Sequence, residues 1–148
     1  MRLTRLAAAV LVLFGMGAGS AVHAEQFQPF DDYEVHYNAF NSSFLPPEVA
    51  QAYNIQRSKY GALLNVAVLQ VGDNGKKPVR ANVVGTLKNL MGQVQDLEFK
   101  EIEEGEAVYY IADFRFTNDE ILSFDLKVVP APTSSAYEIS FRQHFYAD

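Results

Sequence analysis

Hydrophobic and polar residues alternate along the chain from Gly61 onward, in short runs separated by turn-forming residues. A period of two is typical of strands that bury one face. In the run 79–88, the residues expected to face inward are Val79, Ala81, Val83, Gly85 and Leu87. The run 137–145 alternates in the same way, with Gln143 as its one polar inward position. We therefore expect strands whose apolar sides form one core.

The same pattern predicts seven strands in the chain. They cover residues 33–40, 62–71, 79–88, 97–102, 108–117, 121–129 and 137–145. The segments between them are rich in Gly, Asn, Asp and Pro, which tolerate turn dihedrals. Because these connections are short, we expect consecutive strands to be antiparallel neighbours.

The connection around Asn118 predicts a hairpin between 108–117 and 121–129. Two registers keep the apolar residues of both strands on one face. One places Asp113 opposite Asp125, a like-charge pair, whereas the other places Asp113 opposite Lys127 and Arg115 opposite Asp125. Cross-strand charge pairs contribute about 0.2 to 1 kcal/mol each. We therefore predict the second register.

One short helix is predicted over residues 46–53. Proline is tolerated in a first helical turn, and Glu48 suits the positive end of the helix dipole. We expect this helix to cap an open end of the sheets, with Val49, Ala52 and Tyr53 on its buried side. Together the elements predict an all-β fold, an antiparallel two-sheet sandwich of the immunoglobulin-like kind. A closed barrel is the alternative, because periodicity does not distinguish the two.

The first 24 residues have the layout of a cleavable secretory signal. Arg2 and Arg5 precede the apolar run 6–14, and small residues lead to Ala24. The apolar run is much shorter than the roughly 20 residues that span a bilayer as a helix, so a retained anchor is the weaker alternative. We expect cleavage after Ala24, a single domain over residues 25–148 in the periplasm, and no stable membrane span afterwards.

Charge and composition exclude several classes of partner and site. The net charge is −6, and it becomes −8 without the signal, which contains Arg2 and Arg5 and no acid. Nucleic acid and anionic lipid are poor partners for such a surface, because phosphates need clustered Lys and Arg. The absence of Cys excludes disulfides, thiolate metal sites and lipid attachment to cysteine. The core must therefore come from aromatic and β-branched residues.

No coherent catalytic set stands out in the sequence. A histidine base would have to be His36 or His144, and no Gly-x-Ser-x-Gly motif accompanies either. We therefore expect no enzyme activity and no cofactor, with an enzyme of unrecognised type as a further alternative.

The leading hypothesis is an exported periplasmic binding or assembly module. Its partner would be another periplasmic protein, while the ligand and the oligomeric state stay open. The candidate binding residues are His36 and Asn38 on the first predicted strand, and Arg57 and Lys59 in the loop after the helix.

The alternative hypothesis is a metal-binding protein that uses both histidines. His36 and His144 lie on the first and last predicted strands, which approach each other in many sandwiches. Asp31, Asp32 or Asp148 would complete such a site. Copper is less favoured, because residues 25–148 contain one methionine and no thiol.

Several runs resemble a family of small exported proteobacterial proteins described as a domain of unknown function, number 4426. These runs are DYEVHYNAF at 32–40, FLPPEVA at 44–50, NLMG at 89–92, YYIA at 109–112 and FY at 145–146. The resemblance covers nearly all of residues 25–148 and implies export and a compact domain. Because the family has no assigned activity, it implies no site residues.

Overall fold

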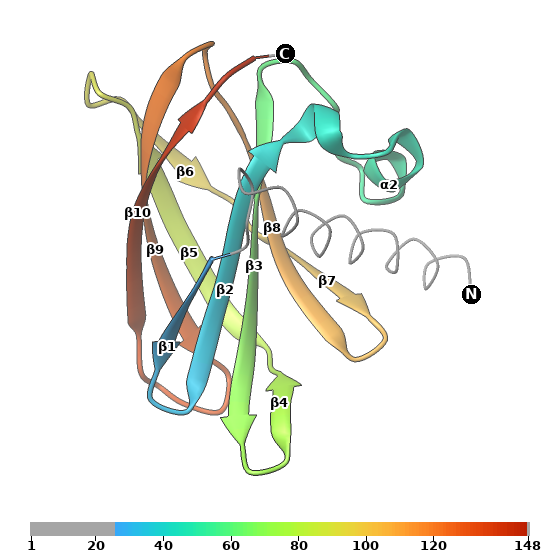
Figure 1. The fold of residues 1–148 in the computed structure, drawn as a ribbon, viewed down its shortest axis with the longest axis vertical. Coiled ribbons are helices and arrows are strands. Elements are labelled where there is room, and N and C mark those ends of the chain that lie inside the picture. The colour runs from blue at the N-terminus through green and yellow to red at the C-terminus, as the bar shows by residue number, and fades with distance from the viewer. Residues whose placement is uncertain (1–25, 148) are drawn as a thin grey trace.

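The fold is a sandwich of two antiparallel sheets (Figure 1), described by a computed structural model for residues 26–147. Sheet A has the order β1 (Gln26–Phe30), β2 (Tyr33–Asn41), β3 (Gly61–Gly72), β8 (Ala107–Arg115) and β7 (Lys100–Glu104), and β4 (Gly75–Pro78) pairs with β3. Sheet B has the order β10 (Tyr137–Phe145), β9 (Glu120–Pro130), β5 (Ala81–Lys88) and β6 (Val94–Leu97). The predicted signal sequence lies outside the described residues.

The order of the strands is that of an immunoglobulin domain. Apart from β1 and β4, sheet A reads β2-β3-β8-β7 and sheet B reads β10-β9-β5-β6. These orders correspond to strands ABED and GFCC′ of the immunoglobulin fold. The prediction of an immunoglobulin-like sandwich is confirmed, and the described strands form two sheets rather than a closed barrel. No helix within residues 26–147 is long and apolar enough to cross a membrane.

The predicted inward positions form the core between the sheets. Val83, Leu87, Ile139 and Phe145 are buried, whereas Val84, on the polar side of its strand, is 48% exposed. Gln143 also faces inward, and its side chain donates a hydrogen bond to the Ala39 carbonyl of sheet A at 2.9 Å. Gln143, the one polar residue on the inward side of β10, therefore connects the two sheets by a hydrogen bond.

The predicted hairpin between 108–117 and 121–129 is wrong. The two strands are β8 in sheet A and β9 in sheet B, so Asp113 does not lie opposite Lys127. Phe114 instead meets Phe124 across the core, with ring centroids 5.3 Å apart. Burying one such side chain contributes about 1.5 to 3 kcal/mol, which exceeds a cross-strand charge pair. Packing between sheets therefore outweighs the charge pairing that a hairpin would offer.

The predicted strand 97–102 is two strands in different sheets. β6 ends at Leu97 in sheet B, and β7 begins at Lys100 in sheet A. Leu97 belongs to the core and Phe99 packs against it, so the alternation continues through the crossing. With β1 and β4, which were not predicted, the described residues form ten strands.

The helix covers the outer face of sheet A rather than an end of the sandwich. A 3-10 turn, η2 (Ser42–Phe44), leads into α2 (Pro47–Ala52). The buried cluster beneath α2 consists of Phe40, Leu45, Val49, Ala50, Leu63, Tyr109 and Ile111. The outward-facing residues of β2, β3 and β8 beneath α2 are apolar. Without the helix, sheet A would expose this apolar surface to water. Ala50, and not the predicted Ala52, is the buried alanine.

The sandwich leaves no room for a side chain at Gly85. A Cβ atom there would lie 2.6 Å from Leu126 Cδ2 and 2.9 Å from the Asp125 carbonyl oxygen. We expect Gly85→Ala to lower the free energy of unfolding by about 1–3 kcal/mol in urea denaturation, because backbone must shift. Gly72→Ala is the control, since its Cβ would have only an ordinary contact at 3.9 Å. Equal stability of the two variants would contradict the packing at Gly85.

Candidate functional site

Exposed hydrophobic side chains gather at one end of the sandwich. Tyr60 is 41% exposed, Leu90 69%, Met91 79%, Val94 56% and Tyr146 55%, and we call these five residues the loop-end surface. They come from the segment before β3, the β5–β6 connection with the start of β6, and the residue after β10. These segments lie at the same end of the molecule as the β8–β9 connection (Figure 1).

A pocket of about 430 Å³ lies within this end. It is lined by Tyr60, Asn89, Gln93, Gln95, Arg115, Phe116, Thr117 and Glu120. Gln95 Nε2 donates to the Arg115 carbonyl at 3.1 Å, and Glu120 Oε1 accepts the Thr117 backbone N–H at 2.9 Å. The Phe116 N–H donates to the Tyr60 carbonyl at 3.0 Å. Hydrogen bonds thus join β6, the segment before β3 and the β8–β9 connection around the pocket.

The turn that presents Leu90 and Met91 is fixed by Asn89. Its Oδ1 accepts the backbone N–H of Met91 at 3.0 Å and that of Gln93 at 2.9 Å. Gly92 closes the turn at φ +83, a left-handed conformation that favours glycine. The two apolar side chains are therefore held outward by a hydrogen-bonded backbone. Clustered exposed apolar residues are typical of protein interaction sites.

His36 and Asn38, two of the predicted binding residues, lie on the outer side of sheet A in β2. His36 Nε2 is 3.0 Å from Glu34 Oε1, and Lys76 Nζ is 3.1 Å from the same oxygen. These contacts lower the pKa of Glu34, the hydrogen bond with His36 most strongly. The Phe27 ring stacks on His36 with centroids 5.1 Å apart. The His36 imidazole is thus held by a carboxylate and an aromatic ring.

Asn38 is nearly buried and lies directly opposite Asn65 of β3. Asn65 is 2% exposed, and its Oδ1 is the one buried side-chain polar atom without a hydrogen-bond partner within residues 26–147.

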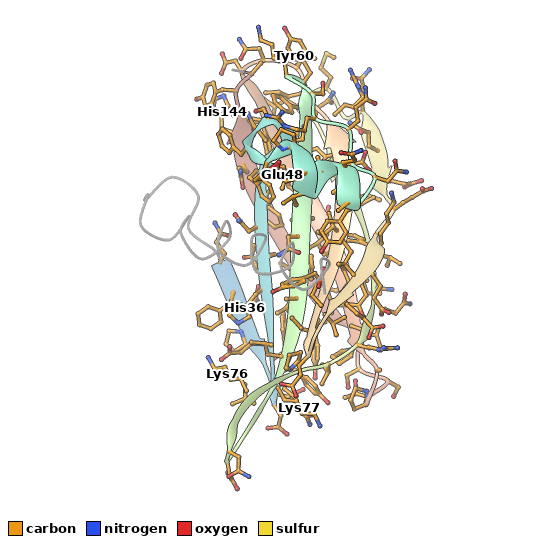
Figure 2. The ribbon with its side chains drawn as sticks, turned by 90° about the vertical axis from the view of Figure 1, so that its right-hand side faces the viewer. His36, Glu48, Tyr60, Lys76, Lys77 and His144 are labelled. Carbon is orange, nitrogen blue, oxygen red and sulfur yellow. The ribbon has the colours of Figure 1, made fainter. Side chains whose placement is uncertain are left out.

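Arg57 and Lys59, the other predicted binding residues, lie in the loop after α2. Arg57 Nη2 donates to the Ser43 carbonyl at 2.9 Å, which ties this loop to η2. The Lys59 ammonium lies 5.8 Å from the ring centroid of Tyr60, at the loop-end surface. Figure 2 shows Tyr60 at the end of the molecule and His36 well below it. The structure therefore does not bring the four predicted residues together.

The two histidines of the metal hypothesis also lie apart. His144, labelled in the upper part of Figure 2 and well above His36, has Nε2 at 2.5 Å from Asp119 Oδ1, and its ring stacks on Tyr146. Asp31 accepts a hydrogen bond from the Tyr137 hydroxyl at 2.8 Å, and Asp148 lies outside the described residues. In the described part of the chain, no group of three or more His, Asp or Glu side chains could hold a metal ion.

Sequence reasoning missed Leu90 and Met91 because it treated 89–92 only as a turn. The available signal was the presence of two large apolar residues in a segment where polar ones are expected.

Solved structures of low sequence identity share the fold. FetP of uropathogenic Escherichia coli, recombinantly expressed in the periplasm of E. coli, is 12% identical with a TM-score of 0.59, over 84% of this chain and 95% of FetP. A copper-bound variant of FetP is 13% identical with a TM-score of 0.57, over 84% and 92% of the two chains. No curated protein matches the sequence.

A crystal structure at higher identity is that of a DUF4426 family protein from Pseudomonas aeruginosa. It is 42% identical, with a TM-score of 0.74, over 84% of this chain and 96% of that one. The family described as "Domain of unknown function (DUF4426)" matches residues 27–148. The resemblance found in the sequence is confirmed, and the chain belongs to the DUF4426 family.

Proposed function

We propose that this protein is an exported, non-catalytic binding module of the periplasm, which holds a protein partner at the loop-end surface. The observation that carries the proposal is the exposure of Leu90 and Met91 on a turn that Asn89 fixes by hydrogen bonds. The signal-like layout of residues 1–24 supports export, and FetP, which shares the fold, was recombinantly expressed in the periplasm.

The energetics favour a partner with an apolar segment. Covering a Leu or Met side chain contributes about 1.5 to 3 kcal/mol, at about 25 cal/mol per Å². Because the turn is already ordered, little conformational entropy is lost when a partner binds. Arg115 and Glu120 in the adjacent pocket offer a cation and a carboxylate to polar groups of the same partner. The surface thus combines an apolar contact with polar groups beside it.

Photo-crosslinking in living cells tests the proposal. We expect a benzophenone amino acid at position 90 to give one defined protein adduct in the periplasm, identified by mass spectrometry. Adding Met91→Ser and Tyr60→Ser to the same chain should reduce the yield of that adduct several-fold, because the apolar contact area is lost.

The matched control places the probe at Asn74, in the exposed turn between β3 and β4 at the opposite end of the molecule (Figure 1). This position should give no such adduct. The same adducts from both positions, or an unchanged yield after the serine substitutions, would refute binding at the loop-end surface.

A second candidate function is metal binding at His36. It is favoured by the Glu34–His36 contact and by the shared fold with FetP, of which a copper-bound variant is known. Lys76 would have to leave Glu34 for a cation to bind there. Elemental analysis of untagged protein purified from the periplasm tests this function. A metal content near one equivalent that falls in His36→Ala would support it, and a content far below equimolar would dispose of it.

A further inference from the structure

The strand β10 is a regular strand at the edge of sheet B. It pairs with β9 through nine consecutive residue pairs, from Tyr137↔Val128 to Phe145↔Glu120. Within residues 26–147 no strand pairs with its other side. The other edge strands β1, β4, β6 and β7 have four or five residues, whereas β10 has nine and contains neither Pro nor Lys. An edge of this kind is a template for pairing with another chain.

The residues of β10 are complementary to a second copy of themselves. On the outer face of the strand lie Glu138, Ser140 and Arg142, all of them exposed. If two copies pair antiparallel about a two-fold axis at Ser140, Glu138 of each copy lies opposite Arg142 of the other. We propose that two copies of this chain form a dimer in this way, and that their two B sheets become one continuous sheet.

Charge selects this register among its neighbours. With the axis at Ile139, Glu138 would lie opposite Ser140. With the axis at Phe141, Arg142 would lie opposite Ser140 and Glu138 opposite His144, which already contacts Asp119 of its own chain. With the axis at Ser140, both charged residues meet opposite charges, twice per dimer because the interface is symmetric. Opposite charges directly across antiparallel strands are favourable and like charges are unfavourable. The occupant that fits this edge is therefore a second copy of the chain.

The inner side of the strand also suits this register. Ile139 would lie opposite Phe141 of the second copy, and Tyr137 opposite Gln143. Tyr137 and Phe141 are only partly buried in the single chain, so pairing would cover apolar surface that is still exposed. The surface is distinct from the loop-end surface, so dimerisation and partner binding can fail independently.

A single cysteine reports the register directly, because the chain has no cysteine of its own. Ser140→Cys places two thiols opposite each other at the axis, where the Cα atoms of a directly opposed antiparallel pair lie about 4.5–5.5 Å apart, within the roughly 4.4–6.8 Å that a disulfide spans. Under mild oxidation we expect a disulfide-linked dimer of Ser140→Cys. The matched control is Asn82→Cys, an exposed position on β5, which is separated from the edge by β9. Equal and slow dimer formation by both variants would overturn the proposal.

Charge reversal tests the pairing by a second route. We expect Glu138→Arg or Arg142→Glu alone to weaken dimerisation roughly tenfold or more in sedimentation velocity, since each reversal creates two like-charge pairs. The double variant restores both opposite-charge pairs and should dimerise within a few-fold of the unchanged protein. Circular dichroism verifies that each variant is folded. A protein that stays monomeric at all concentrations, or a double variant as weak as the singles, would also overturn the proposal.

Discussion

Replacing Phe124 by alanine is expected to lower the free energy of unfolding by about 3–5 kcal/mol, the usual cost of removing a buried phenylalanine. Phe124 is 1% exposed and lies at the centre of the aromatic core. Its ring stacks on Phe141 with centroids 4.6 Å apart and meets Phe114 and Phe145 at 5.3 and 6.0 Å. Alanine would leave a cavity that these rings fill only in part. Urea denaturation followed by circular dichroism measures the change.

Phe27→Ala is the control for this prediction. Phe27 is 54% exposed, and its main contact is the stacked His36 ring. We expect a change below about 1 kcal/mol, since surface substitutions rarely cost more. Small domains are stable by about 5–15 kcal/mol, so Phe124→Ala removes a large part of the total. If both variants lost the same stability, Phe124 would not be the centre of the core.

Tyr110→Phe is expected to cost about 1–3 kcal/mol, because it leaves a backbone donor without its partner. The Tyr110 hydroxyl accepts the Ala81 N–H at 2.8 Å and donates to Glu101 at 2.8 Å. Tyr110 belongs to β8 in sheet A and Ala81 to β5 in sheet B, so this hydroxyl connects the two sheets. Denaturation at neutral pH measures the loss. Tyr146→Phe, at an exposed position, should change stability little.

The same substitution should alter the response to alkaline pH. Burial raises the pKa of Tyr110 from its ordinary 10.0 to about 12, and the hydrogen bond to Glu101 adds to this rise. The unfolded chain releases the proton first, so the stabilisation is complete below about pH 10 and is lost as pH rises towards about 12. The difference in stability between the unchanged protein and Tyr110→Phe should therefore shrink across this interval. A constant difference from about pH 8 to 12 would contradict the raised pKa.

The alternation of residues predicted which side chains are buried, but not which sheet holds each strand. β5 and β10 were predicted well because each keeps one mainly apolar side, with Gln143 of β10 as the polar exception. The inner sides of the two sheets have the same composition, so a strand that crosses between them keeps the same pattern. For this reason the pattern predicts a single strand through the crossing at 97–100 and a hairpin at the crossing at 116–119. β1 (Gln26–Phe30) shows no alternation of burial and gave no signal.

The candidate site was harder to predict than the fold. His36, Asn38, Arg57 and Lys59 were chosen for their chemistry, whereas their separation depends on which end and face of the sandwich each reaches. The exposure of Leu90 and Met91 follows from the turn that Asn89 fixes and from the absence, within residues 26–147, of any packed segment over it. A turn motif predicts where the backbone reverses direction. It does not predict whether other residues pack against the side chains of the turn.

Three hydrogen bonds between the last residues of the chain, 137–146, and residues 31–41 have a consequence for the order of folding. Tyr137 bonds Asp31, Gln143 bonds Ala39, and Asn41 donates to the Tyr146 carbonyl, across 104 to 106 residues of chain. Contacts between residues so distant in sequence form late and slowly. A polypeptide that emerges with its N-terminus first cannot form these three hydrogen bonds until β10 has also emerged. Until then the rings of Phe114, Phe116 and Phe124, which contact Phe145 in the folded protein, stay accessible to water, to chaperones and to other incomplete chains.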